Sequence, residues 1–551
     1  MDTRRLILLI VFSFSILMLW EAWNRPIATS AETTRQRDDV PAATVVPGTA
    51  APTAAGAVPP GAQSVETSRQ LIEVRTDVMH ARIDPLGGSI VELDLIGHPD
   101  IVDRSQSFVL LGVHRASAQS GLIRTDTAGP ALPNHKSLFT APESRYQLAD
   151  GQDSVSVQLE ASSADGVKFV KTFIFRRGDY QIDVRHEMIN GSAQPVTAQS
   201  YFHLVRDGQE PEGSMMMAPT FTGPAVYTEA DHYKKIPFGD IDKNKAKYPE
   251  QADNGWIAMV QHYFVAAWTP PDQVSRSYYV EKLDEGLYRA GLKLPMPQAA
   301  PGQSVAVEVP LYAGPQEQER LREISPELDV VVDYGWLKVI AKPLFEILKF
   351  LHGLLGNWGL AIIALTVLIK IVFFPLSAAS YKSMAKMRVV APRLQKLKEQ
   401  YGDDRAKMNQ AMMELYKTEK INPLGGCLPV LVQIPVFIAL YWVLLSSVEL
   451  RQAPFYGWIK DLSLQDPLYI LPALMMVSMF IQTKLNPTPP DPVQAKVMMI
   501  MPFAFGIMFF FFPAGLVLYW LVNNILSIAQ QWQITRMIEA SQGKPEASAK
   551  R

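Results

Sequence analysis

The sequence is poor in cysteine, in nucleotide-binding and metal-binding motifs, and in acidic residues within its long apolar runs. Cys427 is the only cysteine among 551 residues, so neither an intrachain disulfide bond nor a four-cysteine metal site can form. The motifs GxxxxGK[ST], HExxH and GxSxG are all missing. We therefore expect no enzymatic activity, no metal and no cofactor.

The chain also lacks a strong net charge, which is -2 at neutral pH. A chain with a net charge near zero lacks the excess of positive charge that binds the phosphates of nucleic acid, so no nucleic-acid recognition is expected. Its soluble part contains histidines without the spacing of metal ligands, and we interpret them as core or surface residues: His80, His98, His114, His135, His186, His203, His232 and His262.

The N-terminal region combines a hydrophobic segment with a linker. Arg4 and Arg5 precede an apolar run that ends with Trp20 and Trp23, aromatic residues of the kind that mark a membrane interface. We predict a membrane anchor over residues 1–25; a signal peptide cleaved near Ala28 or Ser30 is the alternative. Residues 26–65 are rich in Pro and Ala and predict a flexible linker.

A soluble β domain is predicted over residues 66–325. Segments of alternating apolar and polar residues recur there, separated by Gly, Asp, Asn and Pro, as in residues 154–159, 167–175 and 305–309. This pattern is typical of a large antiparallel β-sandwich. Residues 326–356 then show helical periodicity with interspersed lysines, which predicts an amphipathic helix on the membrane surface or a helical linker packed on the sandwich.

Five apolar segments follow, and with the anchor they predict six membrane spans. We place them near residues 358–376, 428–448, 468–484, 497–512 and 516–528. Basic residues are concentrated in the loop between the first two of these spans and are rare in residues 449–467, so the basic loop is expected in the cytoplasm. The N-terminus, the C-terminus and a basic tail over residues 534–551 are then cytoplasmic, and the β domain is outside.

Lys370 is the principal candidate site residue, because it lies within the apolar run of the first of these spans. A charge within a span costs about 2.5–3.5 kcal/mol on insertion scales, which favours a wet cavity or a partner over lipid. Thr366 lies on the same helical face. A lysine that extends to the membrane interface is the alternative.

The cytoplasmic loop, residues 380–427, is expected to form a basic helical hairpin with an apolar stripe. We interpret its methionines, Met384, Met387, Met408 and Met412, as a soft surface that receives varied apolar client segments. An equally open alternative is that they close the seam of the hairpin itself.

Five motifs give the chain a specific resemblance: YKSMAKM at 381–387, NPLGGCLP at 422–429, QIPVF at 433–437, VELRQAP at 448–454 and FPAGLVLY at 512–519. With these motifs the chain resembles the YidC/Oxa/Alb family of membrane protein insertases, and its layout resembles the Gram-negative type. The resemblance implies a polytopic α-helical inner-membrane protein with a five-helix insertase core over residues 357–533. It also implies that the periplasmic domain is an all-β supersandwich similar to sugar epimerases and without their activity.

The resemblance further implies a hydrated groove formed by the five core spans, closed to the periplasm and open to the cytoplasm and lipid, with a basic residue of the second span inside it. Lys370 stands where the family usually has arginine, so the planar fork of a guanidinium is lost. Thr366, Tyr519 and Trp520 match groove-lining positions. The implied partners are nascent integral membrane proteins, the lipid bilayer, the Sec translocon and the translating ribosome. The alternative functions are a solute channel or transporter and a membrane-anchored periplasmic carbohydrate-binding protein.

Overall fold

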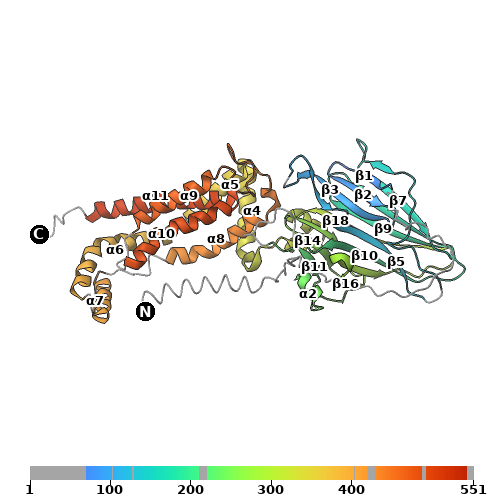
Figure 1. The fold of residues 1–551 in the computed structure, drawn as a ribbon, viewed down its shortest axis with the longest axis horizontal. Coiled ribbons are helices and arrows are strands. Elements are labelled where there is room, and N and C mark those ends of the chain that lie inside the picture. The colour runs from blue at the N-terminus through green and yellow to red at the C-terminus, as the bar shows by residue number, and fades with distance from the viewer. Residues whose placement is uncertain are drawn as a thin grey trace, which may run out of the picture. The chain divides into compact units, whose positions relative to one another are not determined.

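The computed structural model describes residues 70–101, 103–113, 115–126, 129–209, 220–401, 404–419, 428–486 and 492–542. The predicted anchor, nearly all of the linker, the last nine residues of the tail and most of the motif at 422–429 lie outside these residues. The chain forms two compact units, which are described separately (Figure 1). The first contains most of the strands, and the second contains residues 260–265 and the chain from Gly314 onward.

The first unit contains two large sheets. Within the described residues one sheet has the strand order β13-β16-β17-β10-β5-β3-β2-β1-β6, with β4 paired to β3. Its strands are Ile72–Arg75 (β1), Met79–Asp84 (β2), Ser89–Pro99 (β3), Ser107–Leu111 (β4), Ala116–Arg124 (β5), Arg145–Gln147 (β6), Ala198–Asp207 (β10), Gln251–Ala252 (β13), Arg276–Lys282 (β16) and Leu287–Pro295 (β17). The β1–β6 pair is parallel, which the expected antiparallel sandwich did not include.

The second sheet has the order β12-β11-β14-β15-β18-β9-β8-β7. Its strands are Ser154–Ser162 (β7), Val167–Arg176 (β8), Gln181–Asn190 (β9), Gly223–Tyr227 (β11), Lys234–Lys235 (β12), Trp256–Gln261 (β14), Phe264–Trp268 (β15) and Ser304–Pro315 (β18). The alternating segments that predicted strands are β7, β8 and β18. A short helix, Phe238–Asp242 (α2), and one helical turn, Asp284–Gly286 (η1), connect strands.

The inner faces of the two sheets pack against each other. Phe202 of β10 stacks on His186 of β9, with ring centroids 4.4 Å apart, and lies 5.1 Å from Trp268 of β15. All three side chains are almost completely buried. Burial of such large apolar surfaces between sheets is the main driving force for a sandwich fold.

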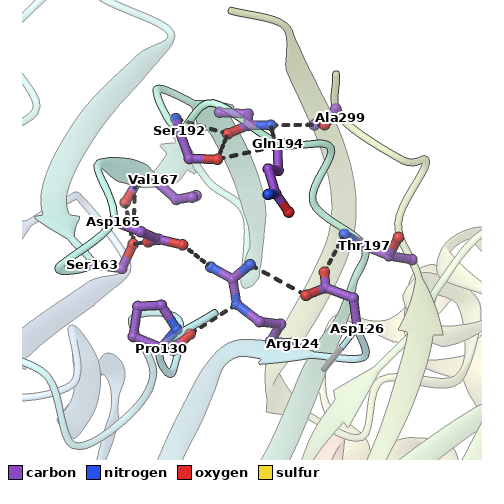
Figure 2. Close-up of polar contacts among 11 residues, drawn as sticks. Arg124, Asp126, Pro130, Ser163, Asp165, Val167, Ser192, Gln194, Thr197 and Ala299 are labelled. Atoms are coloured by element: carbon purple, nitrogen blue, oxygen red, sulfur yellow. Dashed lines mark hydrogen bonds and ion pairs between the residues drawn. The ribbon is translucent and has the colours of Figure 1, made fainter. Parts of the chain in front are cut away.

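A polar network joins the two sheets at one end (Figure 2). Arg124, the last residue of β5, donates to Asp165 in the turn between β7 and β8 over 2.5 Å and to the carbonyl oxygen of Pro130 over 2.8 Å. It also contacts Asp126, which accepts from the backbone N–H of Thr197. The charged groups are partnered within the network, so we interpret it as structural.

The second unit contains the helices. They are Gln318–Ile324 (α3), Lys338–Leu355 (α4), Trp358–Val372 (α5), Phe374–Gln400 (α6), Arg405–Thr418 (α7), Leu428–Ser446 (α8), Ile470–Leu485 (α9), Pro492–Met508 (α10) and Ala514–Gln542 (α11). Single helical turns are Leu328–Val331 (η2), Gly335–Leu337 (η3), Val448–Leu450 (η4) and Phe509–Phe511 (η5). Helix α11 packs against α5, α6 and α9 (Figure 1).

The helices differ in length from the predicted spans. Among the described residues, no single helix has both the length and the hydropathy of a membrane span, whereas α5 and α6 pass together as a pair bent by 66°. Phe373 separates the two helices, and Pro375 follows in the first turn of α6, where a missing N–H is tolerated. Helix α11 continues to Gln542, well beyond the predicted end at Ile528, because its later turns are polar but still helical.

Residues 260–265, at the turn between β14 and β15, cluster with the helical unit. His262 Nε2 lies 3.0 Å from the backbone oxygen of Leu445 at the end of α8. The guanidinium of Arg451 lies 5.3 Å from the ring centroid of Phe264. Burial lowers the pKa of His262 to about 4. A neutral imidazole therefore fits this contact at physiological pH.

Candidate functional site

Lys370 lies near the end of α5, and its side chain is only 6% exposed. The helix begins where the side chain of Asn357 accepts a hydrogen bond from the backbone N–H of Leu360, which is a standard N-cap. The Lys370 Nζ donates to Ser527 Oγ of α11 over 2.6 Å. Among the described residues no carboxylate forms an ion pair with it. The lysine is therefore held by a neutral hydroxyl.

Helix α11 carries further polar side chains that meet the neighbouring helices. Asn523 accepts from Gln433 of α8 over 3.1 Å, and Asn524 donates to Ser478 of α9 over 2.8 Å. Toward the end of α11, Gln531 accepts from Gln482 of α9 over 2.6 Å and donates to Asn486. The requirement for partners at Asn523 and Asn524 was visible in the sequence, because polar groups in an apolar helix must be satisfied.

The other predicted groove residues, Thr366, Tyr519 and Trp520, each have different neighbours. The Thr366 hydroxyl donates to the carbonyl oxygen of Ile362 in its own helix. Tyr519 is fully buried, and its hydroxyl has no hydrogen-bond partner among the described residues. Trp520 stacks on Phe437 of α8 with ring centroids 4.7 Å apart. Lys370, Tyr519 and Trp520 thus lie on helices that share contacts, and their assignment to a groove stays a prediction.

The predicted client-receiving methionines lie on the α6–α7 hairpin. Val390, Leu394 and Tyr416 form its buried seam, and Met387 and Met412 pack against that seam. Met384 and Met408 are partly exposed, whereas Met413 is half exposed. The positions of Met387 and Met412 thus match the seam alternative, and reception of clients by any of the four stays a prediction.

A second polar cluster lies on the sheet of the first unit that contains β10. The Tyr201 hydroxyl lies 2.5 Å from His135 Nδ1, and His203 is bonded to both Tyr279 and Gln119. Burial, with Arg289 as the next cause, lowers the pKa of His135 to about 4. Tyr201 and His203 are almost completely buried. Both ring nitrogens of His203 and the hydroxyl of Tyr201 are hydrogen-bonded within the cluster.

Metal ligation finds no support in the described residues, where no group of three or more His, Cys, Asp or Glu side chains converges. Several histidines of the β unit instead pack against aromatic rings, as His186 does against Phe169 and Phe202, whereas His80 lies 3.2 Å from the carboxylate of Asp94. His186 and His203 are core residues of the β unit.

The polar side chains that join α11 to α5, α8 and α9 form a strip between the helices, and sequence reasoning missed several of its members, among them Ser527, Gln482 and Gln531. Their residue types are common on soluble helix faces, and only the pairing of α11 with α5 and α9 gives them a role. Spacing could have found two of them, because Ser527 and Gln531 follow Asn523 at intervals of four residues and so share its helical face.

Two family models cover nearly the whole described chain. The YidC periplasmic domain model matches residues 71–347, and the 60Kd inner membrane protein model matches residues 350–542. The chain is 54% identical to the membrane protein insertase YidC of Aromatoleum aromaticum, over 98% of each chain, and 53% identical to that of Dechloromonas aromatica, over 100% of each. A solved structure of an active YidC insertase aligns over 84% of this chain and 92% of that chain, with 19% identity and a TM-score of 0.38.

Proposed function

Because the chain belongs to the family of YidC membrane protein insertases, we propose that its helical unit offers the polar tail of a client protein a hydrated, positively charged groove centred on Lys370. The chain is a membrane protein insertase of the bacterial inner membrane, and nascent membrane proteins are its substrates. The groove and the roles of its residues are the proposal.

The observation that carries the proposal is the contact between Lys370 and Ser527. Lysine in an apolar helix is costly unless it meets water or a partner, and a single hydroxyl can accept only one of its three N–H groups. The remaining donors suit a client carboxylate. Amide side chains such as Asn523 and Gln433 extend the polar path beside it.

The energy for insertion comes from the client. Transfer of about 20 apolar residues into a hydrocarbon layer about 30 Å thick is favourable, so no nucleotide is required. The task of the insertase is to lower the barrier for the short polar tail on the far side of the client segment. A fixed positive charge does this for acidic tails by Coulomb attraction, and we propose that no covalent chemistry takes place.

The proposed membrane arrangement keeps six spans, with both termini and the α6–α7 hairpin in the cytoplasm and the β unit in the periplasm. Its support is the charge distribution, since the hairpin carries many Lys and Arg residues and residues 449–467 carry only Arg451 and Lys460. The α6–α7 hairpin would then face emerging nascent chains. The Sec translocon and the translating ribosome are the proposed partners there.

Substitution of Lys370 tests the groove directly. At an effective dielectric constant of about 20, unit charges about 8 Å apart interact by about 2 kcal/mol, so Lys370→Leu should slow insertion of acidic tails between tenfold and a hundredfold. Lys370→Arg should preserve it, because the charge remains. The measurement is protease protection of the client tail in vesicles that contain each variant.

A second lysine provides the matched control. Lys484, at the end of α9, is exposed, and its ammonium lies 5.4 Å from the ring centroid of Phe480. Lys484→Leu should insert acidic and neutral tails at the parental rate. If Lys370→Leu slowed the insertion of acidic and neutral tails equally, the lysine would support the fold instead of attracting charge.

A further inference from the structure

Most of the segment between α8 and α9 is a loop, residues 447–467, which is unusual because about half of its side chains are buried. We call it the outer loop. Loops normally lie at the surface, because a buried backbone needs a partner for every polar group. Ten of its side chains are less than one tenth exposed: Ser447, Val448, Leu450, Arg451, Ala453, Ile459, Asp461, Leu462, Ser463 and Asp466.

The outer loop covers the first turn of α5. Asn357, which caps that helix, also donates from Nδ2 to the carbonyl oxygens of Pro454 and Phe455, at 3.1 and 3.4 Å. A Cβ atom at Gly359 would collide with the ring of Phe455. Glycine therefore lets the loop lie directly on the start of the helix.

The same loop covers the first turn of α11. The backbone N–H of Ala514 donates to the carbonyl oxygen of Leu464 over 2.6 Å, and that of Gly515 donates to Leu462 over 2.9 Å. These amides have no partner within their own helix, so the loop carbonyls satisfy them. A Cβ atom at Gly515 would lie 3.1 Å from the Leu462 oxygen. A second glycine thus permits a second close contact.

Asp466 connects the loop to the start of α9. Its side chain is 1% exposed. One carboxylate oxygen accepts from the indole N–H of Trp458 and from the backbone N–H of Leu468, at 2.9 and 3.0 Å. The other accepts from the backbone N–H of Leu471 over 2.7 Å. Three donors on one buried carboxylate fix the middle of the loop to the helix.

Lys370 and Ser527, the hydrogen-bonded pair of α5 and α11, lie at similar distances from the ends of their helices that the outer loop covers. With a rise of 1.5 Å per residue, Lys370 lies about 18 Å from the start of α5 and Ser527 about 20 Å from the start of α11. Both helices begin under the outer loop. The outer loop therefore covers the end of the helix pair toward which a tail would move after leaving Lys370.

We propose that the outer loop is the barrier that closes the proposed groove on its outer side, and that Asp466 is the residue that positions it. This inference rests on the proposed function and names the part that keeps the groove closed when no client is present. Without the carboxylate, the N–H groups of Trp458, Leu468 and Leu471 lose their acceptor. The loop then opens more often, and small solutes enter from the periplasm.

The test is access of a small, membrane-impermeant thiol reagent to the groove from the periplasmic side. In a Cys427→Ser background, Thr366→Cys places a thiol about 12 Å below the start of α5. Asp466→Ala should raise the labelling rate in spheroplasts about tenfold, a factor that corresponds to about 1.4 kcal/mol. Asp466→Asn should give a smaller increase, because its amide oxygen still accepts from Trp458 and Leu468.

Gly359→Ala provides a second variant that leaves Asp466 intact, because its new methyl group pushes on Phe455. It should also raise labelling. Two controls should leave labelling at the parental rate. Lys460→Ala removes an exposed charge from the same loop, and Gly353→Ala adds a methyl group that meets nothing within 4 Å.

Labelling that is equal in the parent, Asp466→Ala and Gly359→Ala, including no labelling in any of them, would overturn the inference. The measurement contains no client. Failure of Lys370→Leu to discriminate between tails would therefore overturn the proposed groove chemistry while leaving the labelling result to decide the role of the outer loop.

Discussion

Lys171 of β8 shows how a single charged residue can connect the two sheets of the β unit. It is completely buried, and its ammonium donates to the carbonyl oxygens of Gly87, Gly88 and Ser120, at 2.8, 3.0 and 3.0 Å. Burial lowers the pKa of Lys171 to about 7. The three acceptors match the three N–H groups of an ammonium, which opposes that effect but does not remove it.

We predict that Lys171→Met destabilises the β unit by about 2–4 kcal/mol, because three buried carbonyl groups lose their donor. In the parent, the folded state binds fewer protons than the unfolded state above pH 7. The free energy of unfolding should therefore rise from pH 7 to 9, and this rise should be smaller in the variant. The measurement is hydrogen exchange of β8 and β9 amides in the full chain. Lys168→Met, at a partly exposed ion pair with Glu160, should change neither quantity much.

At the scale of single elements, α4 is amphipathic, and its lysines form ion pairs within the protein, which the sequence did not predict. Its lysines pair with the preceding acidic segment: Lys338 with Glu327, Lys342 with Asp329 and Lys349 with Glu319. Its exposed apolar residues include Val339, Phe350 and Leu354, and Trp336 just before the helix is also exposed. The charged side therefore binds the protein itself, and a position of the exposed apolar side on the membrane surface stays a prediction.

Asp329 is central to this arrangement, and its loss should release α3 and η2 from α4. Burial alone would raise its pKa, but hydrogen bonds from Arg322 and Lys342 hold the pKa below its usual value. Its stabilising effect is therefore present above about pH 4 and is lost as the pH falls through the lowered pKa. Asp329→Asn should lower protection of the α3 amides by roughly 2 kcal/mol at pH 7.

The difference between Asp329→Asn and the parent should shrink as the pH falls below 4, where the parent carboxylate is also protonated. Hydrogen exchange, corrected for the intrinsic rate at each pH, measures both points. Glu323→Gln, in α3, provides a control and should leave the protection of the α3 amides unchanged. A difference that is independent of pH would show that the side chain acts by packing alone.

The α6–α7 hairpin separates two kinds of methionine. Photo-crosslinkers at Met413 and Met408 should capture a nascent client, whereas one at Met412 should react mainly with the hairpin, because Met412 packs against Val390, Leu394 and Tyr416. The products can be separated by their mass on a gel. Efficient client capture at Met412, with none at Met413, would mean that the seam opens to receive clients.

At the scale of the whole molecule, the sequence predicted the classes of structure better than their partners. Period-two patterns located β7, β8 and β18, and apolar runs located α5 and α8–α11, because burial on one side leaves a local signal. The contact of Lys370 with Ser527 was not predictable, since it depends on which helices pack together. The contact of Asp329 with Lys342 was not predictable for the same reason. The continuation of α11 beyond its apolar part was also missed, because the hydrophobic pattern ends before the helix does.

Deletion of the β unit tests whether the helical unit is sufficient for insertion. We expect a chain lacking residues 70–313 but retaining α3 and α4 to insert clients, because the polar strip lies wholly on the helices. The outer loop should be less protected from exchange in that chain, since the deletion removes His262 and its contact with Leu445. Retention of residues 260–265 on a short linker is the matched control. Complete loss of insertion from a stably expressed deletion would contradict this expectation.

Helix α11 connects the two ends of the helical unit as a rigid rod. It runs without proline from Ala514 to Gln542, which corresponds to about 43 Å of continuous helix. Its first turn is bonded to the outer loop, and Gln531, about 26 Å further along the helix, is bonded to α9. A rod of this length transmits a tilt. A displacement imposed at Gln531 therefore acts through the helix on the outer loop, about 26 Å away.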